Sequence, residues 1–485
     1  MPQTKRQLAH ASRSKPANGK RPATSTPDAE EADHTSPLKR RGRLSPEERV
    51  RARRLARFRT VGVVTSGIVL FCAAIIGLVF SARPTTSEVE RRALSALPTF
   101  DWQDFWDGSY FSDLSLWYSD TYPLRENLVA ANQALDALHG IETDARMVGG
   151  TKLADELPPS TESGDKPSTS PEERKDVEVP NTEEMAAAIQ SQITDGLYVK
   201  GDTAYNIYYF SQEAVDAYAD AINATAEELA GQVQVYSLIA PNSSGIMLPE
   251  EESSQLGGTN QADAIDYFYS QYGDDVRAVN AVPYLKKHTD EYIYFRTDHH
   301  WTARGAYYAY LAFCDAKGIE PESILDLRQE NYGDFLGSFY SQLNSTQMAA
   351  NPDYVEAWIP KGTNTMTLYD TDGSAETYNV ITDTTDWDVL GKTMAFIMGD
   401  QPLEMIENPT ITDGSSCLVI KDSFGDFFVP WLVDSYQTVW VADFRYFEGN
   451  IKDFVTEHGI RDLIIESNIS LAGGGVYAPA ILGRL

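Results

Sequence analysis

Residues 417–433 read CLVIKDSFGDFFVPWLV, and this stretch decides the fold. Its first four residues form an uninterrupted apolar run, which is typical of a strand that other elements cover on both faces. The segment from Phe424 onward has the pattern of a short helix. Ser423 lies at the junction, where a sharp turn would expose its hydroxyl and direct backbone N–H groups toward a developing oxyanion. The G-x-S-x-G sequence of a nucleophile elbow is absent.

Strand and helix patterns alternate over most of the chain after residue 185. Residues 211–231 have the apolar spacing of an amphipathic helix, and the apolar run at 233–240 predicts a buried strand. A further helix is expected between Thr302 as N-cap and Gly318 as C-terminal stop. More strands are predicted at 292–296, 417–421, 438–444 and 462–466. This alternation predicts an α/β fold with a parallel sheet, helices on both faces and sites at the carboxyl ends of the strands.

Two segments depart from this pattern. Residues 352–396 contain an Asp372-Gly373 hairpin signal between strand-like runs, which predicts a small β-rich insertion. The strand-like runs lie at 354–359, 365–369 and 376–381. Residues 152–184 are poor in large apolar residues and rich in Pro, Ser, Thr, Glu and Lys, which indicates a flexible insertion.

The second motif is Asp298-His299-His300-Trp301, which follows the aromatic and β-branched run EYIYFR at 291–296. In an extended backbone residues i and i+2 face the same side, so Asp298 would hold the imidazole of His300. Such an aspartate fixes the tautomer of the histidine and stabilises the imidazolium that forms when the ring accepts a proton. His299 would point the other way.

A metal site is the alternative at this motif, because imidazole and carboxylate groups are ordinary zinc ligands. Adjacent side chains diverge in an extended segment, however, and no further histidine cluster or Cys-x-x-Cys motif lies nearby. A histidine beside a tryptophan is also commonly a packing residue. We favour a relay of Asp298, His300 and Ser423, with Ser423 Oγ within about 4 Å of a His300 ring nitrogen. We predict no metal and no cofactor.

The chain resembles the bacterial DHHW family, which is named for the four residues found here at 298–301. The decapeptide RTDHHWTARG at 296–305 is the specific part of this resemblance. Supporting stretches are SEVERRALSALP at 87–98, YSDTYPLRENL at 118–128, VIKDSFG at 419–425 and VADFRYF at 441–447. The resemblance covers most of residues 85–485. This family is similar to the SGNH-hydrolase-like domains of the alginate O-acetylation proteins AlgX and AlgJ.

The resemblance assigns roles to three residues. The Asp-x-His pair of the alginate proteins falls on Asp298 and His300, and their nucleophilic serine falls on Ser423. Ordinary SGNH hydrolases place the serine first, so the resemblance implies a permuted SGNH-hydrolase-like topology. The middle position of the pair is itself a histidine, His299, which places a second imidazole beside the expected base.

Other side chains near these motifs are weaker candidates. Trp301 would stack on a sugar ring, and Arg125 and Arg445 would bind polar substrate groups, although each also fits a structural role. His299 and Asp422 adjoin the expected base and nucleophile and are expected to support them.

The resemblance implies transfer of an acetyl group to a cell-surface or secreted polysaccharide through an acetyl-serine intermediate. It also implies a partner, a multispanning membrane-bound acyltransferase that supplies the acetyl group. A carbohydrate esterase is one alternative, in which water accepts the acetyl group. The other alternative is a non-catalytic protein of the same fold that binds or assembles polysaccharide.

The N-terminal part has the composition of a membrane anchor. Residues 1–59 indicate a disordered basic tail, and residues 1–60 contain sixteen Lys and Arg against six Asp and Glu. The 23 residues 60–82 carry no charge, and at about 1.5 Å per residue a helix of that length crosses a hydrocarbon core of about 30 Å. By the positive-inside rule the tail is cytoplasmic and residues 83–485 are extracytoplasmic. A cleavable signal peptide is the alternative, although the tail is far longer than a normal n-region.

Charge separates the two sides of this span. The basic tail would contact anionic lipid headgroups. Removing its excess of ten positive charges from the formal charge of −31 leaves −41 for residues 61–485. This excess of acid excludes nucleic acid as the expected partner and favours a neutral glycan. Cys314 and Cys417 lie in apolar runs that suit buried thiols, and their spacing leaves a disulfide open.

Overall fold

The computed structural model describes residues 196–485 without a gap. Before residue 196 it describes shorter pieces: residues 65, 86–87, 92–93, 96–100, 102, 110–111, 114, 117–118, 121–123, 145–149, 154–158, 170, 177–181 and 184–185. The chain forms two units, Met1–Ile76 and Gly77–Leu485, and every element described below belongs to the second. The basic tail 1–59 lies outside the described residues, and so does the predicted span 60–82 apart from residue 65. Among the described residues, no helix is both long and apolar enough to cross a membrane.

Five parallel strands form the centre of the main sheet, in the order β14-β13-β15-β6-β7. They are β6 (Gln234–Ala240), β7 (Val276–Val279), β13 (Ser416–Lys421), β14 (Thr438–Asp443) and β15 (Asp462–Asn468). Every residue of β13 and β15 is buried; the apolar run in β13 predicts this, whereas β15 also buries polar residues such as Glu466. The strands predicted from sequence at 233–240, 417–421, 438–444 and 462–466 are therefore confirmed.

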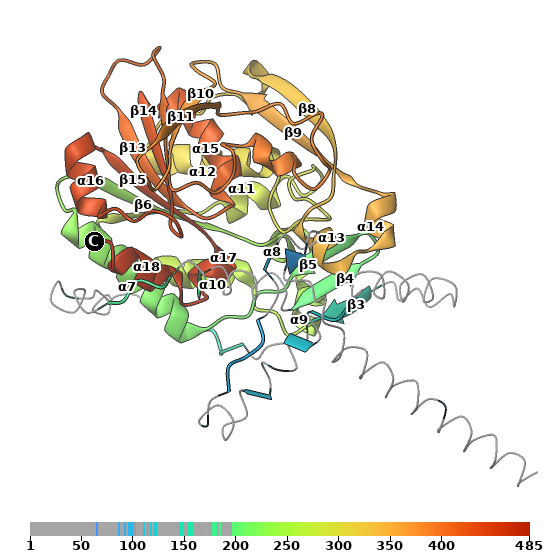
Figure 1. The fold of residues 1–485 in the computed structure, drawn as a ribbon. Helices are drawn as coiled ribbons and strands as arrows, with labels where there is room; N and C mark the ends of the chain where they lie inside the picture. The colour runs from blue at the N-terminus through green and yellow to red at the C-terminus, as the bar shows by residue number, and fades with distance from the viewer. Residues whose placement is uncertain are drawn as a thin grey trace, which may run out of the picture. The chain divides into compact units, whose positions relative to one another are not determined.

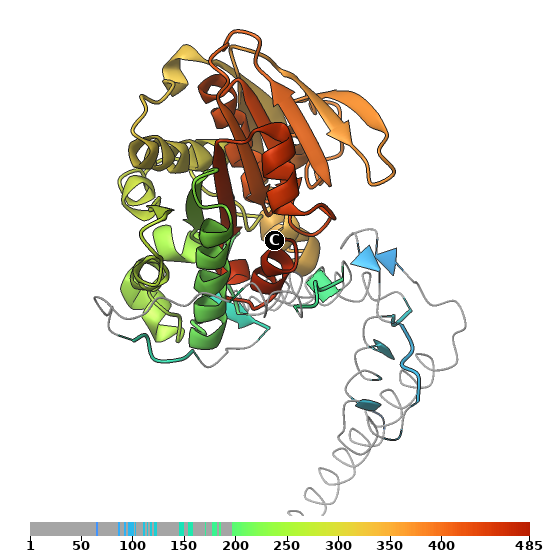
Figure 2. The same cartoon turned by 90° about the vertical axis from the view of Figure 1, so that its left-hand side faces the viewer.

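Three antiparallel strands extend this sheet beyond β14. They are β12 (Leu403–Glu407), β10 (Thr365–Tyr369) and β11 (Ala375–Asn379), in the edge order β11-β10-β12. The sheet of eight strands is therefore mixed, and the predicted parallel arrangement holds for five strands but not for the other three. Figure 2 shows the orange β10–β11 hairpin at the edge of the sheet. Gly373 in the hairpin turn has φ +81°, which a glycine adopts without strain.

The helices cover both faces of the sheet. The main ones are α7 (Gln212–Glu228), α10 (Gln261–Ser270), α11 (Val282–Lys286), α12 (Ala303–Lys317), α15 (Gly425–Leu432), α16 (Ile451–His458) and α18 (Tyr477–Leu482). On β6, Tyr236 contacts Phe313 of α12, whereas the next residue, Ser237, bonds Tyr272 just after α10. Successive strand residues face opposite sides, so α12 and α10 lie on opposite faces. Figure 1 shows α12 and α15 on one side of these strands and α7 and α18 on the other.

Smaller elements complete the described part of the chain. A two-stranded sheet joins β8 (Arg328–Phe335) to β9 (Asp353–Ile359), and a three-stranded sheet has the order β3 (Ala145–Val148), β4 (Leu197–Lys200), β5 (Thr203–Asn206). The short helices are α8 (Ser243–Ile246), α9 (Glu250–Gln255), α13 (Ser338–Leu343), α14 (Thr346–Ala350) and α17 (Ile469–Ala472). Residues 352–396 thus contribute strands to two different sheets. Most of the flexible insertion predicted at 152–184 lies outside the described residues.

Two local predictions have opposite outcomes. Thr302 caps α12 by accepting a hydrogen bond from Gly305 N, and Gly318 ends the helix with φ +78°, as predicted. Residues 292–296, in contrast, do not form a strand and contribute only an isolated bridge between Tyr294 and Trp301. Cys314 and Cys417 are free buried thiols, so no disulfide joins them.

Candidate active site

Ser423 lies in the tight turn between β13 and α15, at the carboxyl end of a central strand. Asp422 fixes this turn, because its Oδ1 accepts the Phe424 N–H at 2.9 Å and its carbonyl accepts the Gly425 N–H at 2.9 Å. A Cβ atom on Gly425 would lie 2.4 Å from Lys421 Cβ, so only glycine allows this approach. The turn therefore depends on Asp422 before the serine and Gly425 after it.

The structure brings Ser423, His300 and Asp298 together although 123 residues separate the serine from the histidine. Ser423 Oγ lies 2.7 Å from His300 Nε2, within the 4 Å expected from the sequence. On the other side of the ring, His300 Nδ1 lies 2.6 Å from Asp298 Oδ1. The His300 backbone N–H also donates to this oxygen at 3.0 Å. This hydroxyl–imidazole–carboxylate relay has the geometry that activates a serine for nucleophilic attack.

A distant aspartate, rather than a sheet, holds the segment before Asp298. Asp353 Oδ2 accepts the Arg296 N–H at 2.9 Å, the Thr297 N–H at 2.7 Å and the Thr297 hydroxyl at 2.7 Å. Asp353 is 1% exposed, so these bonds form away from water. These bonds fix a bend on which Asp298 and His300 face the same side. The prediction that the two side chains meet is therefore confirmed, although residues 292–296 do not form the predicted strand.

Ser338 and Gly337 position Asp298 from the α13 end. Ser338 N–H donates to Asp298 Oδ2 at 2.7 Å, so one carboxylate oxygen is held by backbone and the other faces His300. A Cβ atom on Gly337 would lie 2.2 Å from Asp298 Cβ. Neither residue was predicted to be part of the site. In the sequence they are only a Gly-Ser pair after a strand, and such a pair does not indicate contact with a residue 40 positions earlier.

His299 lies beside His300, so the prediction that it points the other way is wrong. The two ring centroids are 3.7 Å apart, because the motif follows a bend instead of an extended strand. His299 Nδ1 lies 2.7 Å from Ser338 Oγ, and the His299 backbone N–H donates to the same oxygen at 3.3 Å. Asp298, His299 and His300 each offer a possible metal-ligand atom, all within 4.8 Å of one another. The divergence argument against a metal therefore fails, although two of these groups are already engaged in the relay.

Trp301 is fully buried, which excludes the predicted stacking on a sugar ring. Its indole N–H donates to the Phe424 carbonyl at 2.9 Å, and the two rings meet edge to face. A tryptophan in this position joins the start of α12 to the turn that carries Ser423. Trp301 therefore belongs to the motif because it supports the turn that carries the nucleophile.

Burial and charge set the proton affinities of the relay. Burial of Asp298 favours its neutral form, but the neighbouring His300 and His299 and the Ser338 N–H outweigh it and hold the pKa well below the usual range. Burial also opposes the charge on His300, yet the Asp298 carboxylate raises the pKa of His300 above 6.5. Burial and the adjacent His300 lower the pKa of His299 to about 3. His300 is therefore the imidazole of the pair that is tuned to accept a proton.

A buried group of charges lies directly beneath the turn. Lys421 is fully buried, and its Nζ contacts Asp426, Asp400 at 3.0 Å and Asp443 at 3.4 Å. Arg445 bonds Asp443 Oδ2 and Asp400 Oδ1, each at 2.5 Å, so its guanidinium is occupied by structural partners. This contradicts the predicted contact of Arg445 with substrate. Arg125, the other predicted arginine, lies outside the described residues.

Asp422 is buried against the neighbouring strand. Besides the turn, it accepts the Asn468 N–H at 2.6 Å, and burial raises its pKa to about 6. Asn468 in turn donates through its amide to Ala240 O at 3.2 Å and Asn242 Oδ1 at 2.8 Å. These residues stand at the carboxyl ends of β15 and β6. They were missed because an isolated asparagine after an apolar run is a common strand end.

Comparison with known proteins places this site in a family. The family model for the DHHW protein matches residues 90–166 and 163–442. The chain belongs to the DHHW family. A solved DHHW family protein from Eubacterium siraeum has a TM-score of 0.54 and 27% identity, over 60% of this chain and 95% of that one. No curated protein matches.

One further solved structure shares the fold of this DHHW chain, and a more distant one is also similar. Bacillus cereus PatB1 has a TM-score of 0.51 and 20% identity, over 58% of this chain and 98% of that one. The O-acetyltransferase domain of Pseudomonas putida AlgJ has a TM-score of 0.32 and 12% identity, over 56% of this chain and 90% of that one. The match of the family model confirms the family predicted from the sequence.

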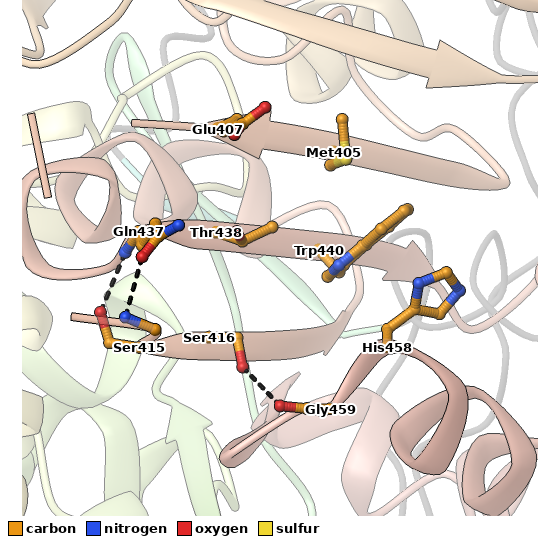
Figure 3. A pocket seen from close by; sticks show the side chains of 10 residues that line it. Met405, Glu407, Ser415, Ser416, Gln437, Thr438, Trp440, His458 and Gly459 are labelled. Atoms are coloured by element: carbon orange, nitrogen blue, oxygen red, sulfur yellow. Dashed lines mark hydrogen bonds between the residues drawn. The ribbon is translucent and has the colours of Figure 1, made fainter. Parts of the chain in front are cut away.

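This DHHW chain also has a cavity of about 320 Å³ at the opposite end of the main sheet (Figure 3). Thr438 and Ser416, which begin β14 and β13, line it together with Trp440, His458 and Glu407. Ser423 follows the other end of β13, so the cavity lies roughly 20 Å away at about 3.3 Å per strand residue. A substrate in that cavity would not reach the relay.

Proposed function

We propose that this protein is an extracytoplasmic serine acyltransferase that O-acetylates a cell-surface or secreted polysaccharide. The proposal is carried by one observation, the relay from Asp298 through His300 to a serine hydroxyl 2.7 Å from the ring. The acetyl group as the transferred group and the glycan as its acceptor are inferred from the resemblance to the alginate O-acetylation proteins. The same resemblance is the basis for a permuted SGNH-hydrolase-like topology.

The first half-reaction forms an acetyl ester on Ser423. His300 Nε2 accepts the Ser423 proton as Oγ attacks the carbonyl carbon of the acetyl donor. The negative charge of Asp298 stabilises the resulting imidazolium. The bond between the acetyl carbon and the donor oxygen then breaks, and His300 gives its proton to that oxygen. Ser423 now carries the acetyl group and His300 is neutral again.

The second half-reaction passes the acetyl group to a sugar. A hydroxyl of the glycan gives its proton to His300 Nε2 and attacks the acetyl carbon. The bond to Ser423 Oγ breaks, and His300 returns the proton to that oxygen. If water attacks instead, the product is free acetate and the protein is an esterase.

A developing oxyanion needs donors close to Ser423. Among the described residues, no acceptor is bonded to the Ser423 backbone N–H, whereas the N–H groups of Phe424 and Gly425 are both engaged by Asp422. The eight-residue helix α15 begins two residues after the serine and adds the positive end of its dipole. Both amide hydrogens of Asn468 are used in structural bonds. We therefore assign the Ser423 N–H as one oxyanion donor.

The rest of the proposal concerns location and partners. We propose that residues 60–82 span the membrane once, with the tail 1–59 in the cytoplasm against anionic lipid and residues 83–485 outside. The acetyl group would come from a multispanning membrane-bound acyltransferase. A neutral glycan suits the acid excess of the outer part better than a polyanion does.

The test uses the purified full-length protein in detergent with 4-nitrophenyl acetate. The wild type should release 4-nitrophenol, and intact mass spectrometry should detect an acetyl adduct on Ser423. Ser423→Ala should abolish both signals, and His300→Ala should lower turnover on the order of 10³-fold or more. Wild-type protein that neither turns over the ester nor acquires the adduct would favour a non-catalytic glycan-binding protein.

A further inference from the structure

Because Trp301 is buried, an aromatic surface for a sugar has to be sought among other side chains. Within residues 196–485, only four large apolar side chains are strongly exposed: Leu325, Tyr354, Trp387 and Val389. Two of them, Trp387 at 40% and Val389 at 38%, occupy one loop between β11 and β12. The two residues are two positions apart, so one short segment presents both side chains to solvent.

This loop is built as a braced platform. Lys392 is 3% exposed, and its Nζ donates to the carbonyls of Thr384 at 2.6 Å and Thr385 at 2.5 Å. The Thr384 hydroxyl donates back to the Lys392 carbonyl at 3.2 Å, and the Trp387 N–H donates to Thr384 O at 3.0 Å. A buried ammonium placed on two loop carbonyls holds both ends of the loop together. The exposed tryptophan therefore stands on a rigid base, which lowers the entropy cost of binding.

The loop is joined to the relay through the backbone. Val389 O accepts the Leu336 N–H at 3.1 Å, and the next residue, Gly337, packs against Asp298. Counting about 3.8 Å between successive Cα atoms, Trp387 lies at most about 20 Å from Asp298 along this path. A few linked sugar units span that distance. The platform is thus within reach of a glycan whose hydroxyl group is at Ser423.

We propose that Trp387 and Val389 form an acceptor subsite that binds a pyranose ring of the glycan beside the reaction centre. An indole offers a flat apolar face to the C–H groups of a sugar ring while its edge stays polar. Asp386 and Asp388, both exposed on either side of Trp387, supply acceptors for the sugar hydroxyls. The inference rests on the proposed function, because the subsite would favour a glycan over water as the acceptor of the acetyl group.

Kinetics on two substrates isolates the subsite from the chemistry. The full-length protein would transfer acetyl from 4-nitrophenyl acetate to four neutral probes: cellohexaose, maltohexaose, mannohexaose and chitohexaose. Trp387→Ala should raise the KM for the best acceptor about tenfold, the equivalent of one lost aromatic contact. Release of 4-nitrophenol without acceptor should not change. Trp387→Phe should recover part of the affinity, and Leu325→Ala, which removes an exposed side chain elsewhere, should behave as wild type.

Direct binding keeps this inference separate from the proposed function. Saturation-transfer NMR with Ser423→Ala protein measures sugar binding when no reaction is possible. Loss of binding in the Ser423→Ala, Trp387→Ala double variant supports the subsite even if the wild type proves catalytically inactive. The proposal is overturned if none of the four probes binds, or if Trp387→Ala leaves both binding and acceptor KM unchanged. A variant that impairs only co-purification of a membrane acyltransferase would assign the loop to a protein partner and would also overturn it.

Discussion

At the level of single residues, Asp298 controls both the position and the proton affinity of His300. Its carboxylate raises the pKa of His300 above 6.5, and only the neutral imidazole accepts the serine proton. Activity should therefore be low at pH values below this raised pKa and should increase as the pH rises through it. Asp298→Asn removes the charge that raises the pKa, so the acid limb should move to lower pH while kcat falls on the order of 10³- to 10⁴-fold.

Kinetic measurement from pH 5 to 9 with 4-nitrophenyl acetate checks this prediction. The thermal unfolding midpoint of Asp298→Asn, measured at each pH, shows whether the variant is folded. An acid limb that stays in place in a folded variant would mean that another group, and not His300, titrates in the rate profile.

His299 poses a different question, namely which imidazole is the base. Its pKa is lowered to about 3, and its Nδ1 is occupied by Ser338 Oγ at 2.7 Å. His299→Gln should therefore slow turnover only about five- to tenfold, the effect of one lost neutral hydrogen bond, and leave the acid limb unmoved. His300→Gln should abolish turnover. Equal losses in the two variants, measured under the same conditions, would contradict the assignment of His300 as base.

At the level of elements, Trp301 joins α12 to the turn before α15. Trp301→Phe removes the indole N–H and leaves the buried Phe424 carbonyl without its donor, at a cost of about 1–3 kcal/mol in the free energy of unfolding. Because this carbonyl follows Ser423 directly, kcat should fall as well. Urea denaturation and ester hydrolysis measure the two effects.

Trp431→Phe is the matched control for this change. Trp431 lies within α15, and its indole N–H donates to Ala303 O at 3.1 Å, so the same group is lost elsewhere in the same pair of helices. The control should lower stability by a similar amount and leave kcat nearly unchanged. If both variants lose stability and activity in equal proportion, Trp301 supports the fold in general and not the nucleophile.

Lys421 joins β13, α15 and β14 through its three aspartate partners. Lys421→Met would leave Asp426 buried without a cation, and Asp400 and Asp443 with Arg445 alone, at a cost of about 3–5 kcal/mol at neutral pH. Burial already raises the pKa of Asp426 to about 7, and loss of the lysine charge should raise it further. A group with a raised folded-state pKa stabilises the fold below its unfolded value, and that stability is lost as pH rises through the folded value. Denaturation at pH 5 and pH 8 should therefore show the larger loss at pH 8, whereas equal losses would contradict this account.

The elements predicted correctly from sequence are those whose own residues decide them. The strands β6, β13, β14 and β15 each contain a short apolar run, and α12 carries its own cap and stop. Residues 292–296 have the same strand-like composition, but Asp353 takes the N–H groups of Arg296 and Thr297. No local sequence pattern predicts a hydrogen-bond partner 56 residues away. The same reason explains why the antiparallel β12 and the support from Ser338 were missed.

At the level of the whole molecule, the candidate site was predictable because one specific motif, at residues 296–305, was combined with a weaker strand-end signal at Ser423. The turn at Ser423 and the pair at Asp298 and His300 were found separately, and their convergence followed from the strand-end rule for parallel sheets together with the family resemblance. Trp301 and Arg445 were assigned to substrate because a sequence does not show burial. Trp301, just before α12, instead donates to the Phe424 carbonyl of the turn, and Arg445, just after β14, pairs with Asp443 and Asp400.

The contrast between the basic residues 1–60 and the acidic residues 61–485 leads to a prediction about membrane attachment. If residues 60–82 span the bilayer, alkaline carbonate should leave the full chain in the membrane fraction, because electrostatic contacts dissolve in carbonate and a spanning helix does not. Protease added to intact cells should cut within residues 83–485 and spare the tail. A variant lacking residues 60–82 but keeping the tail should be extracted by carbonate. Release of the unaltered chain by carbonate would show that the basic tail alone, held to anionic lipid, accounts for attachment.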